Sequence, residues 1–318
     1  MAKTSTVCAG IDTGKDKLDM AVAGLDEDVT VANDAAGWRQ LADHCKQHRV
    51  AKVGIEATGG YERGVVRHLQ AAGLRVAVLQ PMQVRAYARL KQQRAKSDRI
   101  DARLIAACVQ SLGDAARPAA DARFDAVADL LTFIEQIEED IARIKTRLEH
   151  VGDARLRRID EGDIKRLCKR REQEQTRLIA ALRGDDELGR RFDLVCSIPG
   201  CGERTALSIV VRLPELGEVS REAAAALAGL APFVHESGTF KGERHIGGGR
   251  ARLRRALYMA ALPASFRWNP ALVELYRRLR ARGKSHSCAL VACARKLLIM
   301  ANAVVARGTP WEVRPATA

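Results

Sequence analysis

The chain has 318 residues, 47% of them apolar, which is enough for two or three compact units with hydrophobic cores of their own. Lys and Arg number 53 against 39 Asp and Glu, so the net charge of +14 is that of a protein that binds polyanions. No uninterrupted apolar run approaches the roughly 20 residues of a membrane-spanning helix, and the N-terminus lacks the apolar stretch of a signal peptide. We therefore expect a folded cytoplasmic protein with no membrane partner.

The 8 cysteines are scattered and lie mostly in apolar segments, where a reduced thiol behaves as a small hydrophobic group. Disulfides are therefore not expected. The nearest approach to a metal cluster combines Cys196 and Cys201 with His286, Cys288 and Cys293. Neither cysteine pair has the CxxC spacing typical of zinc ribbons, so we do not expect a zinc site.

Short apolar runs alternate with helical patterns over about the first 110 residues. The runs at 6–11 and 18–23 follow each other closely and predict a β-hairpin. The elements that follow are a helix at 37–49, a strand at 52–55, a helix at 62–72 and a strand at 75–79. Strands that alternate with helices predict an α/β sheet domain, which we assign to residues 1–118.

Beyond Pro118 the pattern changes to apolar residues that are spaced alternately three and four apart, which is a heptad seam. The seam consists of Val127, Leu130, Ile134, Ile137, Ile141, Ile144, Leu148 and Val151. An interruption follows at residues 160–163, and the spacing then resumes with polar residues inside the seam. Residues 119–186 are predicted to form a helical hairpin or a dimerising coiled coil, and two helices packed on their own domain fit the pattern equally well.

From about Arg190 onward, helical patterns alternate with glycine-rich breaks and dense arginine, which predicts a mostly helical third domain at 187–318. The whole chain is thus expected to combine an α/β part with an all-α part. Within the third domain, the sequence IPGCG has the form of a helix-hairpin-helix turn. Its Gly200 and Gly202 would let backbone amides face a phosphate at a helix N-terminus, and the alternative is a plain corner between helices.

A second glycine-rich break, at residues 247–249, precedes a basic helical turn. Here the glycines would allow close approach to a phosphate that Arg250, Arg252 and Arg254 would hold. Slightly earlier, Lys241, Arg244 and His245 are candidates for stabilising charge on a reacting phosphate, although a solvated loop is the ordinary interpretation. Aromatic residues make up only 4% of the chain, so stacking on bases is not expected to be its main mode of binding.

Four carboxylates are placed where metal-dependent phosphoryl transfer would need them. Asp12 and Glu56 each follow a predicted strand, and neighbouring strands would bring them to one edge of the sheet. Asp98 and Asp101 are three residues apart on a predicted helix and share one face. Such a cluster can hold two Mg²⁺ ions about 4 Å apart. Each residue taken singly also fits a structural role, as a turn residue, a strand end or an ion-pair partner.

Basic residues surround the paired aspartates and would neutralise phosphates beside a metal site. The closest in sequence are Arg94, Lys96 and Arg99, and the flanks add Arg85, Arg89, Lys91 and Arg103. A solvated helix face is the alternative for this stretch. Carboxylate spacing and charge together favour metal-dependent chemistry on nucleic acid.

The segments GIDTGKDKLDMAV, GIEATGGYE and KSDRIDARLIA resemble the DEDD motif of the bridge-RNA-guided insertion-sequence transposases, a family that includes the pilin-gene invertases. The resemblance implies a RuvC-like N-terminal domain with the RNase H-like fold. It also implies that Asp12, Glu56, Asp98 and Asp101 coordinate Mg²⁺, for which Mn²⁺ can substitute.

The C-terminal segments SIPGCGERTALSIV and HESGTFKGERHIGGGRARLRRALYMAALPA resemble the second conserved domain of the same family. The family places a nucleophilic serine at a Ser-Gly step, which here is Ser237, and such a serine forms a covalent phosphoserine link to DNA. The resemblance implies that donor and target DNA are the substrates, that a noncoding RNA guides the reaction, and that carboxylates and serine act on one phosphate. Strand exchange needs at least two active sites, so we expect a homodimer or homotetramer.

Two other functions fit parts of the pattern. A RuvC-like structure-specific endonuclease would use the same carboxylates with water as the nucleophile and would not need Ser237. A non-catalytic nucleic-acid-binding protein would use the basic surface alone and would need neither Asp12 nor Mg²⁺.

Overall fold

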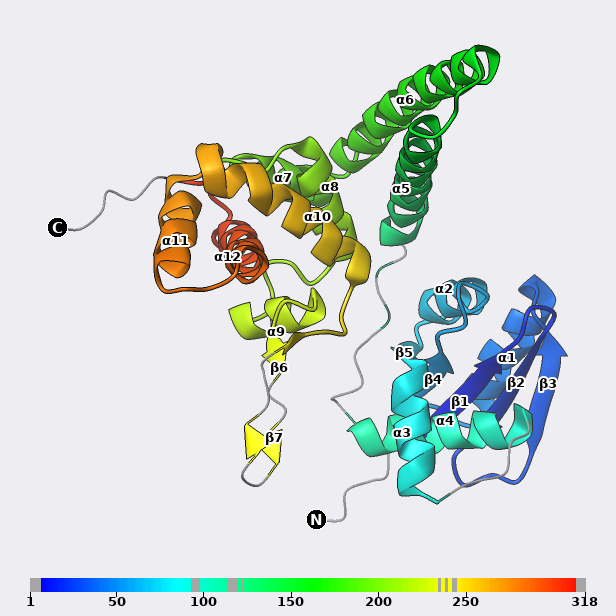
Figure 1. The fold of residues 1–318 in the computed structure, drawn as a ribbon. Helices are drawn as coiled ribbons and strands as arrows, with labels where there is room; N and C mark the ends of the chain where they lie inside the picture. The colour runs from blue at the N-terminus through cyan, green and yellow to red at the C-terminus, as the bar shows by residue number, and fades with distance from the viewer. Residues whose placement is uncertain are drawn as a thin grey trace. The chain divides into compact units, whose positions relative to one another are not determined.

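The computed structural model describes residues 7–92, 98–113, 119, 121, 123–233, 236–237, 240–241 and 245–312. For residues 98–100 and for the strand residues 236, 237, 240 and 241 it describes the backbone only. The chain divides into two compact units, Met1–Ala122 and Arg123–Ala318 (Figure 1). The helices of the predicted coiled-coil segment lie in the same unit as the C-terminal helices.

The first unit is built on a five-stranded mixed sheet of strand order β3-β2-β1-β4-β5. The strands are β1 (Cys8–Thr13), β2 (Lys17–Val22), β3 (Asp28–Ala32), β4 (Lys52–Glu56) and β5 (Arg75–Leu79). The first three strands form an antiparallel meander, whereas β4 runs parallel to both β1 and β5. The predicted hairpin and the α/β class are therefore confirmed.

Helices cover both faces of this sheet. They are α1 (Ala35–Gln47), α2 (Arg63–Ala71), α3 (Pro81–Leu90) and α4 (Asp98–Leu112). One core joins Ala9 and Ile11 of β1 to side chains of α1 and α2, and a second joins Cys8 to side chains of α3 and α4. Because successive strand residues point to opposite faces, even-numbered β1 residues face the α3 and α4 side.

Residues 123–183 form a helical hairpin, as predicted, made of α5 (Arg123–Leu148) and α6 (Ala154–Arg183) (Figure 1). The break in the pattern was predicted at the wrong place. The chain turns at residues 149–153, and α6 runs without interruption through residues 160–163. The reason is that Asp160 is buried, where it accepts hydrogen bonds from the Arg147 guanidinium across the turn. These hydrogen bonds hold the pKa of Asp160 below its ordinary value.

The base of the hairpin belongs to the main core of the second unit. Phe124, Val127 and Leu131 of α5 pack in one cluster with Leu178 and Leu182 of α6. The two helices are thus packed on their own domain at the base, and the hairpin extends beyond it (Figure 1). The structure thus combines the predicted helical hairpin with two helices packed on their own domain, and dimerisation through the hairpin stays a prediction.

A glycine substitution tests the continuity of α6. Gly162 lies inside the helix, and among the described residues no heavy atom lies within 4 Å of the position that a Cβ would take. Gly162→Ala should raise the free energy of unfolding by about 0.5–1 kcal/mol, since alanine loses less backbone entropy in a helix. Chemical denaturation measures this. The matched variant Gly200→Ala should destabilise, because Gly200 has φ +86°. A lower stability of Gly162→Ala would mean that the helix is interrupted after all.

The rest of the second unit is mostly helical, as predicted. Its helices are α7 (Asp186–Cys196), α8 (Glu203–Arg212), α9 (Arg221–Leu227), α10 (Ala251–Pro263), the π-helix η2 (Ala264–Trp268), α11 (Pro270–Ala281) and α12 (His286–Arg307). Four two-residue strands form two ribbons, β6 (Pro232–Phe233) with β9 (His245–Ile246) and β7 (Glu236–Ser237) with β8 (Phe240–Lys241).

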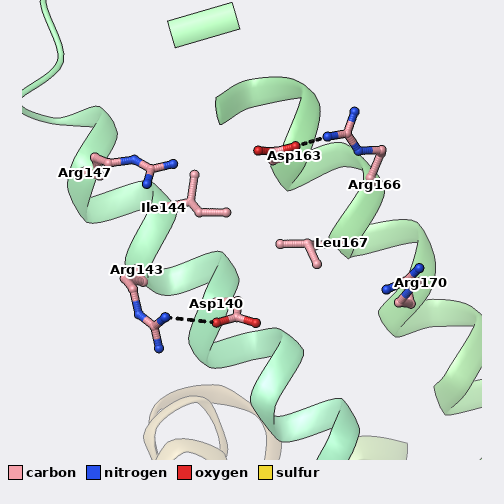
Figure 2. A pocket seen from close by; sticks show the side chains of 8 residues that line it. All are labelled: Asp140, Arg143, Ile144, Arg147, Asp163, Arg166, Leu167 and Arg170. Carbon is pink, nitrogen blue, oxygen red and sulfur yellow. Dashed lines mark hydrogen bonds and ion pairs between the residues drawn. The ribbon is translucent and has the colours of Figure 1, made fainter. Parts of the chain in front are cut away.

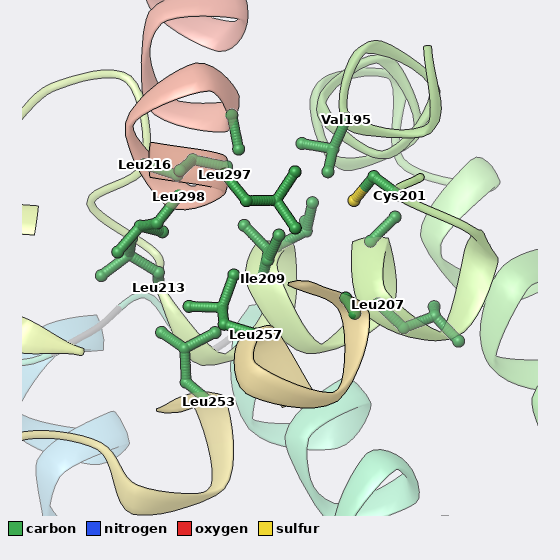
Figure 3. Close-up of a cluster of buried hydrophobic side chains, with 14 of the residues drawn as sticks. Val195, Cys201, Leu207, Ile209, Leu213, Leu216, Leu253, Leu257, Leu297 and Leu298 are labelled. Carbon is green, nitrogen blue, oxygen red and sulfur yellow. The ribbon is translucent and has the colours of Figure 1, made fainter. Parts of the chain in front are cut away.

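The helices of this unit enclose a single large core. Figure 3 shows Leu297 and Leu298 of α12 beside Leu257 of α10 and Ile209 of α8. In the part of the chain that is described, α12 is the one helix long and apolar enough to cross a membrane, and 56% of its apolar stretch is buried inside the unit. This is the burial expected of a central core helix.

Candidate functional site

The parallel pairing of β1 and β4 positions two of the predicted carboxylates. Ile11 and Ile55 are register partners, so Asp12 and Glu56 occupy the next position on neighbouring strands. Strand alternation places Asp12 on the same face as Gly10, and Glu56 on the same face as Gly54. Both carboxylates are half-buried, and the Asp12 Oδ1 accepts a hydrogen bond from the Thr13 amide at 3.0 Å. The two strand ends therefore present their carboxylates to one side of the sheet.

Helix α4 lies on that same side and approaches the sheet unusually closely. A Cβ on Gly10 would lie 2.2 Å from both the Ala102 carbonyl oxygen and the Ala106 amide nitrogen. A Cβ on Gly54 would lie 3.0 Å from the Cβ of Val109. The two glycines thus leave the space that the helix fills. A side chain at Gly10 would push α4 away from the strand that carries Asp12.

The direction of α4 brings its first turn toward the strand ends. The buried Lys52, the first residue of β4, donates a hydrogen bond from Nζ to the carbonyl of Gly113, just beyond the end of α4. The helix N-terminus therefore points toward the opposite end of β4, where Glu56 lies. Asp98 is the first residue of α4, and Asp101 precedes the sheet-facing Ile105 by one helical turn.

The structure describes the side chains of three of the four predicted metal ligands. The structure brings Asp12, Glu56 and the half-buried Asp101 to one face and one end of the sheet. The Asp98 side chain lies outside the described residues. Among the side chains that are described, no three His, Cys, Asp or Glu residues lie close enough together to hold a metal ion. This applies equally to the described cysteines and histidines of the second unit.

One predicted phosphate contact has a different role in the structure. Arg103, on the exposed side of α4, donates from Nε to the Asp28 carboxylate at 2.9 Å and from Nη2 to the Asp26 carbonyl at 2.7 Å. The Asp28 hydrogen bond and charge raise the pKa of Arg103. Arg103 therefore fixes α4 against the turn between β2 and β3.

Two residues that the sequence did not single out organise the loops behind the carboxylates. The side-chain nitrogen of Asn33 (Nδ2) donates to the Gly14 carbonyl at 2.9 Å and to the Tyr61 carbonyl at 3.1 Å, which ties the loop after Asp12 to the loop after Glu56. Burial disfavours ionisation of Glu62, but hydrogen bonds from the backbone of Gly60 and Thr58 and from the Thr58 hydroxyl hold its pKa below the ordinary value. The sequence signal for this role of Glu62 is its position as an acidic residue at the start of a predicted helix.

A further carboxylate lies next to Asp12. Asp19 of β2 is the antiparallel register partner of Asp12, so the two side chains point to the same face. Asp19 is buried, accepts a hydrogen bond from the Thr30 hydroxyl at 2.5 Å and pairs with Lys17 at 3.2 Å. The lysine and the hydroxyl compensate its charge, so Asp19 supports the position of β2 beside the carboxylates.

The predicted C-terminal site falls largely outside the described residues. Ser237 lies in β7, where it is the register partner of Phe240, and Lys241 is the partner of Glu236. For these residues only the backbone is described. The same holds for Arg99 in α4. Arg94, Lys96 and Arg244 lie outside the described residues altogether.

The helix-hairpin-helix turn is packed against its own unit. Gly200 has φ +86°, and a Cβ there would lie 2.6 Å from the Cβ of Ala264. The Asn269 side chain donates to the Pro199 carbonyl at 3.0 Å. Gly200 therefore serves close packing, and the phosphate contact of this turn stays a prediction. Gly202 caps α8 and is exposed, and no described atom lies within 4 Å of a Cβ built on it.

The arginines after the second glycine-rich break contact groups of their own unit. Arg250 makes a two-pronged ion pair with Glu215, at 2.7 and 2.8 Å. Arg252 contacts Glu135 at 2.5 Å, and Arg254 donates to the Gly248 carbonyl at 2.6 Å. In this structure these guanidinium groups hold α10 in place, so the reason for assigning them to DNA phosphates is weaker than the sequence indicated.

A groove between α5 and α6 has a volume of about 390 Å³ and gathers four arginines. Figure 2 shows Arg143 and Arg147 on one helix and Arg166 and Arg170 on the other, around the half-buried Ile144 and Leu167. Arg143 pairs with Asp140 at 3.3 Å, and Arg166 pairs with Asp163. Ion pairs along the hairpin thus offset most of the positive charge in this groove.

Two models of one transposase family match separate parts of the chain. Residues 9–153 match a family model described as a transposase of the DEDD type found in IS110, and residues 192–277 match the model "Transposase IS116/IS110/IS902 family". The chain belongs to the IS110 family of transposases. It is therefore an enzyme that acts on DNA by phosphoryl transfer. The first match contains the four acidic residues, and the second contains Ser237.

Relatives of this transposase include the pilin gene-inverting proteins of Moraxella bovis and Moraxella lacunata. Each is 27% identical over 315 residues, which is 96% of this chain and 97% of the relative. An uncharacterized protein of insertion element IS110 from Streptomyces coelicolor is 39% identical over 124 residues, which is 38% of this chain and 30% of that protein. Among solved structures, Thermus thermophilus RuvC, alone or with a Holliday junction substrate, is 20% identical over 36% of this chain and 99% of its own, with a TM-score of 0.30.

Proposed function

We propose that this transposase cleaves and rejoins DNA strands as a site-specific recombinase that holds Mg²⁺ with Asp12, Glu56, Asp98 and Asp101. The observation that carries the proposal is the shared register of Asp12 and Glu56 on parallel strands, on the face that α4 covers. Carboxylate oxygens suit Mg²⁺, which proteins often bind through one or two carboxylates together with substrate phosphates. Such binding agrees with a site that is completed by DNA.

The side chains of the site have separate roles in this proposal. The carboxylates orient the scissile phosphate, and Asn33 and Glu62 keep the two strand-end loops in place. A bound metal ion would neutralise charge that develops on the phosphate. The Ser237 hydroxyl attacks phosphorus, the bond from phosphorus to the leaving DNA oxygen breaks, and that oxygen takes up a proton. Attack by the hydroxyl of a second strand then releases the serine, so the bond energy is conserved.

We also infer that the protein works as a homodimer or homotetramer with a noncoding RNA of its element as guide. The hairpin supports self-association, because Leu156 and Ile159 of α6 are each 47% exposed near its tip. Apolar side chains on an extended helical pair are typical of a contact with another helix. The names of the Moraxella relatives, which invert a pilin gene, support recombination at specific sites.

Removal of divalent metal tests the catalytic proposal. The full-length protein, incubated with its candidate guide RNA and DNA bearing the element ends, should exchange strands in Mg²⁺. The exchange should stop in excess EDTA and return with Mg²⁺ or Mn²⁺, since the added metal ion would again neutralise the negative charge of the reacting phosphate. Recombinant junctions quantified by sequencing measure this. Exchange at an unchanged rate in EDTA would reject the metal-holding role of the four carboxylates.

A further inference from the structure

The second unit exposes large aromatic side chains on a backbone that is firmly anchored. Phe266 and Trp268 of η2 are 54% and 55% exposed, whereas the flanking residues Ala264, Ser265 and Asn269 are almost completely buried. Exposed aromatics on a rigid segment of a folded protein typically mark a contact surface. This feature belongs to neither the carboxylate site nor the strand that carries Ser237.

The anchoring follows from the hydrogen bonds of the π-helix. The Asn269 amide donates to the Ala264 carbonyl at 3.0 Å, which is the five-residue bond of a π-helix. The Asn269 side chain donates to the Pro199 carbonyl, and the Ser265 hydroxyl donates to the Ala261 carbonyl at 2.5 Å. Single turns of π-helix occur frequently at functional sites. The segment is therefore held in place before any ligand arrives, which reduces the entropy lost on binding.

Neighbouring rings extend this surface. The ring centroids of Phe266 and Tyr276 are 5.0 Å apart, and those of Tyr276 and His286 are 5.9 Å apart with an edge-on geometry. The Tyr276 hydroxyl and His286 Nδ1 lie 2.7 Å apart and share a hydrogen bond. We call the ring cluster of Phe266, Tyr276 and His286, together with the exposed Trp268 of the same π-helix as Phe266, the aromatic platform. Its rings come from three elements, η2, α11 and α12, that the core fixes relative to one another.

Positive charge borders the platform. A groove of about 730 Å³ is lined by Phe266, Arg267, Pro270, Val273, Glu274, Arg277 and Arg278. The lining of this groove thus contains three arginines and a single carboxylate, that of Glu274. The Arg267 guanidinium also lies 4.8 Å from the centre of the Trp268 ring, as in a cation–π pair. A ligand with flat apolar faces joined by negative charges would complement both features.

We propose that the aromatic platform and its arginines bind unpaired bases of single-stranded DNA. Base faces are available for stacking when the bases are unpaired, and arginines beside the rings would contact the flanking phosphates. DNA is the substrate of this family, and strand exchange separates paired strands. The site is independent of the residues that we propose to cleave DNA, so either proposal can fail without the other.

The test is binding of a fluorescein-labelled oligothymidine of about 20 nucleotides to the full-length protein in EDTA, followed by fluorescence anisotropy. Phe266→Ala and Trp268→Ala should each weaken binding about tenfold, the usual loss for one stacking residue. Trp268→Phe should retain binding within about threefold, because it keeps an aromatic face. Phe133→Ala, which removes a 41% exposed ring from α5, should bind as the parent protein does.

Several results would overturn the proposal. Unchanged oligothymidine binding by both alanine variants would reject it, as would an equal loss on duplex DNA of the same length. A loss confined to oligouridine would assign the platform to RNA instead. A change of oligomeric state in sedimentation velocity would assign it to a second copy of the chain. Circular dichroism melting checks the fold, and a retained melting temperature in Trp268→Phe keeps the comparison valid if an alanine variant unfolds.

Discussion

Asp12→Asn should reduce strand cleavage about 10³-fold or more while the protein stays folded. A metal ion at a reacting phosphate supplies several kcal/mol of charge stabilisation, and about 4 kcal/mol corresponds to a thousandfold in rate. The amide oxygen of Asn can still accept the hydrogen bond that the Thr13 amide donates to Asp12 Oδ1. The substitution therefore removes the negative charge and keeps the local structure. Cleavage of end-labelled DNA under single-turnover conditions measures the rate.

The matched control for this variant is Asp16→Asn. Asp16 is exposed on the turn between β1 and β2, and its substitution makes the same change in net charge four residues further along the chain. It should cleave at the parent rate. If Asp12→Asn kept its rate within about tenfold, or if both variants lost activity equally, the assignment of Asp12 as a metal ligand would be wrong.

The carboxylate pattern could be predicted because its determinants are local. Short apolar runs ended directly in Asp12 and Glu56, and the three-residue spacing of Asp98 and Asp101 indicated one helical face. The close packing that positions α4 was not predictable. It depends on Gly10 lying opposite Ala102, which are far apart in sequence and meet only when the sheet has formed. A glycine inside a predicted strand was its sole local signal.

The elements that sequence reasoning missed carry weak patterns. β3 is an edge strand in which only Val31 is buried, and α3 buries only Val84, so neither shows a clear apolar stripe. The prediction of a break near Gly162 failed for a related reason. Acidic residues and a glycine read locally as a turn, whereas the compensating partner of Asp160 lies on the other helix of the hairpin.

Composition alone does not show which side chains the fold brings together. A chain with 4% aromatic residues is not expected to rely on stacking, yet the fold brings Phe266, Tyr276 and His286 together from three helices. Conversely, arginine-rich segments indicated phosphate contacts, but Arg250 and Arg252 pair with Glu215 and Glu135 of their own unit. Averages over the chain do not reveal which side chains the tertiary structure groups or neutralises.

Ser237→Ala should abolish both the covalent protein–DNA adduct and strand exchange, with a loss of roughly 10⁴-fold or more, because no other group then stores the energy of the cleaved bond. Denaturing electrophoresis of labelled DNA detects the adduct, and Ser111→Ala, which removes an exposed hydroxyl from α4, serves as the control. The result also distinguishes a transposase with a serine nucleophile from a structure-specific endonuclease. A structure-specific endonuclease would use water, so it would cut DNA at the parent rate without Ser237 and would show no adduct in either protein. Loss of exchange with full retention of the adduct would place the nucleophile at another residue.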